Sequence, residues 1–196
     1  PPPVPATVPP GVTVRAIGDS VMVSAAAALQ ERLGPSGYID AALNRQFADG
    51  IAVARSVGEG GGADTVVVHL GNNGPVSAGD ADALLAELAA VRTVLVVNLR
   101  VDRPWQGPNN QTLADAVGRH PHARLVDWYG ASEGRPDWFQ SDGTHFRATA
   151  GPGARALADL IAGAVPPPPT TTVAPVATTP VAVPTTAAPP PGTGPR

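Results

Sequence analysis

The sequence contains no cysteine and no lysine, so all thirteen of its basic residues are arginine. The absence of cysteine excludes disulfide bonds and thiolate chemistry, and it is compatible with either redox compartment. The arginines are interspersed with sixteen acidic residues, and the formal net charge is −3. Because the chain has no basic stripe, the sequence predicts no nucleic-acid partner.

Long apolar runs are also missing, since no stretch approaches the roughly 18 residues that a transmembrane helix needs. No secretory leader is recognisable at the start, and we expect a mature form or an excised fragment. Both ends of the chain are rich in proline, and such tracts bury too little apolar surface to offset chain entropy. The sequence therefore predicts a disordered Pro-rich linker over residues 1–10, one domain over 11–165 and a disordered Pro/Thr-rich tail over 166–196.

Short β-branched runs alternate with helix-like segments inside the predicted domain. The run 65–70 is continuous and apolar, which is typical of a strand buried on both faces of a parallel sheet. The expected strands are 12–17, 38–43, 65–70, 91–97 and 123–127; the expected helices are 21–33, 48–57, 80–90 with Asp80 as N-cap, 111–119 and 152–161; and 100–110 is an expected loop. This alternation predicts a three-layer α/β/α domain whose middle layer is a parallel, doubly wound sheet.

Three polar motifs follow predicted strands or lie in the loop after the last one, at residues 18–20, 71–74 and 142–145. The carboxyl ends of parallel strands meet at one edge, so we expect Ser20, Asn73 and His145 to gather there. Ser20 would begin a helix, Asn73 carries an amide donor, and Asp142 is near enough to His145 to orient its imidazole. These are the parts needed for acyl transfer through a serine ester.

Each motif also has an ordinary structural explanation when it stands alone. Ser20 could be a helix N-cap, Asn73 a turn residue before glycine, and Asp142 and His145 a turn residue and a surface residue. All three motifs fall on the same predicted edge, which favours the catalytic interpretation. His69 lies in a buried strand and is predicted to be a hydrogen-bonded core histidine, and no cluster shows metal-ligand spacing.

The set Gly-Asp-Ser, Gly-x-Asn and Asp-x-x-His resembles the SGNH (GDSL-type) hydrolase superfamily. A longer set of motifs is similar to the extracytoplasmic SGNH domain of membrane acyltransferase-3 proteins, which include bacterial peptidoglycan O-acetyltransferases. These motifs are Gly18-Asp-Ser-Val-Met22, Arg45-Gln46, Gly71-Asn-Asn-Gly74, Val97-Asn-Leu-Arg100 and Asp142-Gly-Thr-His-Phe146. The resemblance covers residues 14–164, and it implies the SGNH hydrolase fold with a flavodoxin-like sheet and no metal or cofactor.

The resemblance also implies a role for each motif residue. Ser20 would be the nucleophile, His145 the base and Asp142 its orienting carboxylate. The oxyanion hole would combine the backbone N–H of Ser20, the side chain of Asn73 and the backbone N–H of Asn44, which stands where the superfamily usually has glycine. Asn tolerates a positive φ better than most residues do, and an ordinary turn is the alternative for Asn44.

Four further residues are candidates for substrate binding. Arg45 and Gln46 would shape the floor of the pocket, or else form a solvated helix start. Trp105 and Trp138 lie in long loops, where aromatic side chains either stack on sugars or close the core. Asp19 is expected to be structural, held by backbone donors near Ser20.

We expect a serine-dependent O-acetyltransferase or esterase that acts on cell-envelope glycan outside the bacterial cytoplasm. Its partners would be an acyl donor and a glycan acceptor, and the resemblance leaves open a membrane acyltransferase domain before Pro1. The alternative is a non-catalytic cell-wall or carbohydrate-binding module with the same fold. A lipase ranks last because no apolar lid segment is found. The residues alone do not decide between transfer to a sugar and hydrolysis.

Overall fold

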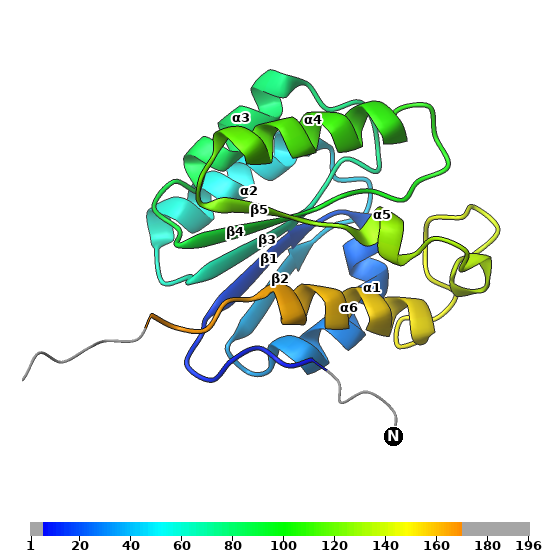
Figure 1. The fold of residues 1–196 in the computed structure, drawn as a ribbon, viewed down its shortest axis with the longest axis horizontal. Coiled ribbons are helices and arrows are strands. Elements are labelled where there is room, and N and C mark those ends of the chain that lie inside the picture. The colour runs from blue at the N-terminus through cyan, green and yellow to red at the C-terminus, as the bar shows by residue number, and fades with distance from the viewer. Residues whose placement is uncertain (1–5, 170–196) are drawn as a thin grey trace, which may run out of the picture.

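A computed structural model describes residues 6–169 of the chain. Residues 1–5 of the predicted linker and residues 170–196 of the predicted tail lie outside the described residues, so the disorder expected of them stays a prediction. Within the described range the chain folds as a sheet with helices on both faces (Figure 1).

The sheet has five parallel strands, and its order is β2-β1-β3-β4-β5. The strands are β1 (Val14–Gly18), β2 (Gly37–Ala41), β3 (Thr65–His69), β4 (Thr93–Val97) and β5 (Ala123–Val126). Every residue of β3 and β4 is buried, as their continuous apolar sequences predict. This order confirms the predicted flavodoxin-like sheet, whose binding crevice lies beyond the carboxyl ends of β1 and β3, where the winding reverses.

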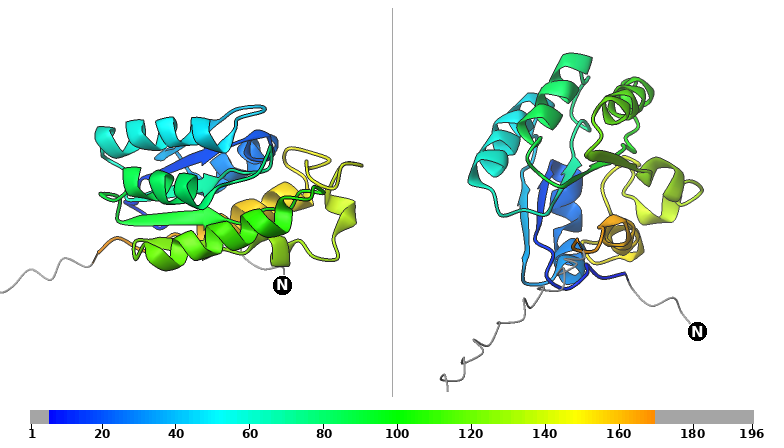
Figure 2. Two further views of the ribbon diagram at one scale, coloured as in Figure 1. Left: turned by 90° about the horizontal axis from the view of Figure 1, so that it is seen from above. Right: turned by 60° about the vertical axis from the view of Figure 1, so that its left-hand side comes forward.

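Helices cover the two faces unequally (Figures 1 and 2). Two lie on one face, α1 (Ser20–Leu33) and α6 (Pro152–Ala164), and three lie on the other, α2 (Phe47–Gly60), α3 (Ala78–Glu87) and α4 (Gln106–Arg119). The loop after β5 contains the short helix α5 (Trp128–Ala131) and the 3-10 turn η1 (Pro136–Trp138). Among residues 6–169, no helix combines the length and the apolar character needed to cross a membrane.

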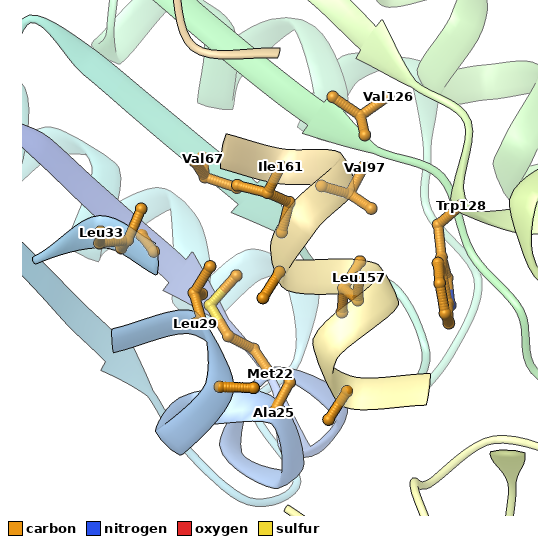
Figure 3. Close-up of a cluster of buried hydrophobic side chains, with 14 of the residues drawn as sticks. Met22, Ala25, Leu29, Leu33, Val67, Val97, Val126, Trp128, Leu157 and Ile161 are labelled. Atoms are coloured by element: carbon orange, nitrogen blue, oxygen red, sulfur yellow. The ribbon is translucent and has the colours of Figure 1, made fainter. Parts of the chain in front are cut away.

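The core between α1, α6 and the sheet fixes the start of α1 in space (Figure 3). Met22 and Leu29 of α1 pack in one cluster with Leu157 and Ile161 of α6 and Val67 of β3, and each of these side chains is at most 1% exposed. Full burial of such a side chain contributes about 1.5–3 kcal/mol. The first turn of α1, which contains Ser20, is therefore part of a closely packed layer.

Two helix starts differ from the sequence prediction by more than one residue. α4 begins at Gln106, inside the expected loop 100–110, and its first turn contains Gly107 and Pro108. Proline is tolerated there, since the first N–H groups of a helix have no helical acceptor. α3 begins earlier than expected, and its N-cap is Ser77, whose hydroxyl accepts the N–H of Asp80 at 3.0 Å. The prediction of Asp80 as the cap was therefore wrong.

The contacts of the domain extend past both predicted boundaries. The backbone N–H of Val8 donates to the carbonyl of Arg32 at 3.3 Å, and the Val8 side chain packs on the core of α1 and α6. At the other end, Arg92 donates to the carbonyl of Pro167 at 2.9 Å. Proline-rich sequence can still place an apolar side chain or a carbonyl against a domain, and composition does not reveal such contacts.

Candidate active site

Ser20 lies where β1 passes into α1, at the carboxyl edge of the sheet. The last residue of β1, Gly18, must be glycine, because a Cβ at this position would collide with the side chain of Met22. Asp19 is the N-cap of α1, and its carboxylate accepts the N–H of Val21 at 3.1 Å. Asp19 therefore takes the capping role considered for Ser20. The N–H of Ser20 belongs to the first helical turn, where the helix dipole favours negative charge.

The structure brings Ser20, His145 and Asp142 into one hydrogen-bonded chain. Ser20 Oγ lies 2.8 Å from His145 Nε2, and His145 Nδ1 lies 2.7 Å from Asp142 Oδ2. Both distances are those of direct hydrogen bonds. With the Nδ1 proton held by the carboxylate, Nε2 is free to accept the proton of the serine hydroxyl.

The loop that carries this pair is folded around Asp142. The second carboxylate oxygen of Asp142 accepts the backbone N–H groups of Thr144 and His145, at 2.9 and 3.0 Å. Burial alone would raise the pKa of Asp142, but the hydrogen bonds from His145 and from the two N–H groups outweigh it and leave the pKa lowered. Gly143 has a φ of 66°, which explains the glycine inside the motif. Asp142 is thus held as an anion beside the imidazole.

The loop after β3 presents two asparagines with different environments. Asn72 is buried, and it donates through its backbone N–H and its side chain to the carboxylate of Asp19, at 3.0–3.2 Å. Asn73 lies in the cleft wall and donates one side-chain N–H to the carbonyl of Arg45 at 3.0 Å. An amide has two N–H groups, so the second donor of Asn73 is not used by this bond. Asp19 therefore has the structural role expected of it, and the second side-chain N–H of Asn73 has no partner among residues 6–169.

The N-terminal part of α4 holds the loop of Asn73 in place, which the sequence did not predict. The side chain of Asn109, 1% exposed, donates to the carbonyls of Gly71 and Gly74 at 3.0 and 2.9 Å and accepts the N–H of Val76 at 2.8 Å. Residues 100–110 were expected to be a loop, and no motif in the sequence pointed to this role for Asn109. Asn109 is a positioning residue rather than a cleft residue.

The triad opens into a cleft of about 210 Å³. Its walls are Ser20, Asn72, Asn73, Val101, Arg103, Trp105, Asp142, Thr144 and His145. Sequence reasoning missed Val101 and Arg103, although both follow β4 and so belong to the same edge of the sheet. Trp105 is half-buried here and donates its indole N–H to the carbonyl of Asn72 at 3.3 Å. A larger hollow of about 530 Å³ lies beside β2 and α2 and includes no residue of the triad.

The other four predicted site residues do not form part of the cleft walls. Arg45 donates to the carbonyls of Gly18 and Asp40 and pairs with the Asp40 carboxylate at 2.6 Å, so it ties the ends of β1 and β2 together. Gln46 is the N-cap of α2, which matches the helix-start alternative. Asn44 has a φ of 57° and an exposed side chain.

Trp138 belongs to the core layer rather than to the cleft. Its ring stacks on Trp128 at 6.1 Å between centroids, and its side chain adjoins Gly153 at the start of α6. The alternative of closing the core therefore fits Trp138, while the cleft position fits Trp105. Nothing in the spacing of the two tryptophans distinguishes these outcomes.

His69 is fully buried at the end of β3, as predicted, but the expected hydrogen bonds are missing. In the described part of the chain neither ring nitrogen has a partner, and burial lowers the pKa of His69, so the ring is neutral. Across residues 6–169, no group of three or more His, Asp or Glu side chains is placed to hold a metal ion.

No family model matches the chain. Its sequence is 37% identical over 131 residues to peptidoglycan O-acetyltransferase OatA of Listeria monocytogenes, covering 66% of this chain and 21% of that protein. It is 33% identical over 147 residues to O-acetyltransferase OatA of Staphylococcus aureus, covering 74% of this chain and 24% of that protein. The chain thus spans between a fifth and a quarter of the length of these curated relatives.

Solved structures show the same architecture. The C-terminal catalytic domain of Streptococcus pneumoniae peptidoglycan O-acetyltransferase A, with a methylsulfonyl adduct, matches with a TM-score of 0.68 at 23% identity, covering 78% of this chain and 92% of that one. The chain has the SGNH hydrolase fold. A lipase/acylhydrolase from Enterococcus faecalis matches this SGNH domain with a TM-score of 0.62 at 15% identity, covering 78% of this chain and 94% of that one. The resemblance predicted from three motifs is confirmed, and these relatives support an SGNH acetyltransferase type of enzyme.

Proposed function

We propose that this SGNH domain is a serine-dependent O-acetyltransferase of bacterial cell-envelope glycan, with the acetyl group carried as an ester of Ser20. The observation that supports this most is the chain of short hydrogen bonds from Ser20 through His145 to Asp142 in an open cleft. Acetyl is proposed as the transferred group because both sequence relatives are named O-acetyltransferases. A glycan is proposed as the acceptor because the Listeria relative is named a peptidoglycan O-acetyltransferase.

In the first step, Ser20 Oγ attacks the carbonyl carbon of an acetyl donor while His145 Nε2 takes the hydroxyl proton. The oxyanion that forms accepts hydrogen bonds from the backbone N–H groups of Ser20 and Asn44 and from the second amide N–H of Asn73. The intermediate collapses when the bond to the leaving group breaks, and His145 returns the proton to that group. Asp142 remains ionised throughout and stabilises the imidazolium.

In the second step, a sugar hydroxyl takes the place of the leaving group. His145 removes the proton of this hydroxyl, its oxygen attacks the acetyl carbon, and Ser20 Oγ leaves and regains a proton from His145. Water in the same position would give hydrolysis, so the occupant of the acceptor position separates a transferase from an esterase. Neither step requires a metal ion or an organic cofactor.

The proposed partners follow from these steps. An acyl donor must reach Ser20 first and a glycan acceptor second, and a glycan of the envelope places the domain outside the cytoplasm. Because the relatives are four to five times longer than the matched segment, we propose that a membrane acyltransferase domain delivers the acetyl group in the full-length protein.

The test is the intact mass of the protein after brief exposure to 4-nitrophenyl acetate. We expect the wild type to gain one acetyl group and Ser20→Ala to gain none. Ser24→Ala is the matched control, because Ser24 lies on the same helix and its hydroxyl donates only to the carbonyl of Val21. A folded wild type that neither forms the adduct nor turns over the ester would point to a non-catalytic glycan-binding module.

A further inference from the structure

A second cavity, of about 320 Å³, adjoins the catalytic cleft. Val101 and Arg103 form part of the walls of both hollows. Gly143 lines the second cavity, while its chain neighbours Asp142 and Thr144 line the cleft. A ligand that fills the second cavity therefore ends beside the triad.

The other walls of this cavity are formed by Arg100, Asp102, Gln106 and Tyr129, and we call the hollow the arginine pocket. Neither Arg100 nor Arg103 forms an ion pair with any residue between 6 and 169, whereas Arg32, Arg45, Arg55 and Arg119 all do. Two arginines and one aspartate leave the pocket with one net positive charge. That balance suits a ligand with a single negative charge.

Arg100 is held in one orientation. Its guanidinium lies 4.6 Å from the centre of the Phe139 ring and donates one N–H to the carbonyl of Ser132 at 2.9 Å. The side chain is only half-exposed, and fixing it in advance lowers the entropy lost when a ligand binds. Of the five N–H groups of the guanidinium, one is bonded to Ser132 and that of Nε is buried without a partner among residues 6–169, so three are left to face the two oxygens of a carboxylate.

Arg103 and Tyr129 supply the exposed part of the pocket. Arg103 is exposed, and its guanidinium donates to the carbonyl of its own neighbour, Asp102, at 2.9 Å. Tyr129 is 45% exposed, although its backbone is fixed by a hydrogen bond to Asn98 at 2.7 Å. An exposed tyrosine ring beside polar groups provides an apolar face for a sugar ring and a polar edge for water.

We propose that the arginine pocket binds a carboxylate on the glycan acceptor. Arg100 and Arg103 hold the carboxylate, Tyr129 contacts a sugar ring, and a hydroxyl of the acceptor then reaches the acetyl ester of Ser20. This inference rests on the proposed function for the transfer step but concerns recognition of the acceptor. It makes the pocket a specificity site for acidic glycans.

The test compares two acceptors that differ only in charge. One is the disaccharide of N-acetylglucosamine and N-acetylmuramic acid, which carries one free carboxylate, and the other is its methyl ester. We expect the wild type to prefer the free acid by about tenfold or more in kcat/KM for the acceptor, as one charge-assisted contact allows. Arg103→Gln should reduce this preference to about twofold.

The preference is a ratio, so a defect in the acetylation of Ser20 cancels from it. Arg135→Gln is the matched control, because Arg135 is also exposed, its guanidinium lies 5.0 Å from the centre of the Trp138 ring, and it does not line the pocket. This variant should keep the wild-type preference. A control variant that loses it, or an Arg103→Gln protein that keeps it, would overturn the assignment.

Direct binding separates this inference from the proposed function. The dissociation constants of both disaccharides for Ser20→Ala, and for Ser20→Ala combined with Arg103→Gln, require no catalysis. We expect about tenfold tighter binding of the free acid to the single variant, weakened by added salt, and a difference of only about twofold in the double variant. Equal binding of acid and ester to Ser20→Ala refutes the carboxylate site, even if Ser20 is acetylated normally.

Discussion

Replacement of Asn73 by alanine removes one donor from the proposed oxyanion hole. The side chain has a second N–H that is not used by its bond to the Arg45 carbonyl, and it lines the cleft next to Ser20. Loss of one such donor typically costs about 2.7–4 kcal/mol of transition-state stabilisation. We therefore expect the rate of Ser20 acetylation to fall by about 10²–10³.

The same change also has a structural cost, which can be separated from the catalytic one. The bond from Asn73 to the Arg45 carbonyl contributes about 0.5–1.5 kcal/mol, which corresponds to a few degrees in Tm for a domain of this size. Asn73→Asp keeps the size of the side chain but offers no donor and adds negative charge. It should slow acetylation at least as much as alanine does.

The assay is the single-turnover release of 4-nitrophenol from 4-nitrophenyl acetate, followed alongside thermal unfolding. Gln30→Ala is the control, because Gln30 also donates its amide to backbone carbonyls, those of Gly34 and Gly37, but lies outside the cleft. This control should lose some stability and keep its acetylation rate. A rate for Asn73→Ala within tenfold of wild type would reduce Asn73 to a turn residue.

Two other predictions concern residues outside the cleft. Asn109→Ala should lower the free energy of unfolding by about 3 kcal/mol, since three hydrogen bonds of about 1 kcal/mol each are lost, and should slow acetylation by at least about tenfold as the loop of Asn73 loosens. Unchanged kinetics in a destabilised protein would show that the loop keeps its position without Asn109. Asp64 accepts hydrogen bonds from the backbone N–H and the hydroxyl of Thr13. Both bonds lower the pKa of Asp64, and the bond from the N–H has the larger effect. A lowered pKa means that the ionised carboxylate stabilises the fold above the unfolded-state pKa of about 4. This stabilisation is lost as the pH falls through the folded-state pKa. Asp64→Asn should therefore lose less stability than the wild type between about pH 5 and about pH 2, as urea unfolding would measure; an equal loss would contradict the role of Asp64.

The fold follows from features that are local in the sequence. Each central strand is a short apolar, β-branched run, and each alternates with a helical segment, so a parallel sheet with helices on both faces is the arrangement that buries them. The order of the strands was reached through the resemblance carried by the motifs. Helix starts were less predictable, because Gly107 and Pro108 resemble a loop while being compatible with a first helical turn.

The sequence by itself determined which residues could form the site. Ser20, Asn73, Asp142 and His145 occur in short motifs at strand ends, and the parallel sheet brings strand ends together at one edge. The distance of three residues between Asp142 and His145 is also local, so their contact was expected from the chain alone.

Only the tertiary structure decided what surrounds those residues. It placed Trp105 in the cleft and Trp138 in the core. It also showed that Arg45 links the ends of β1 and β2, and that Asn109 binds the loop after β3, more than thirty residues away in sequence. Hydrogen bonds and stacking between distant segments depend on how the layers pack, and they leave no periodic pattern in the chain. The arginine pocket beside the triad belongs to the same class of feature.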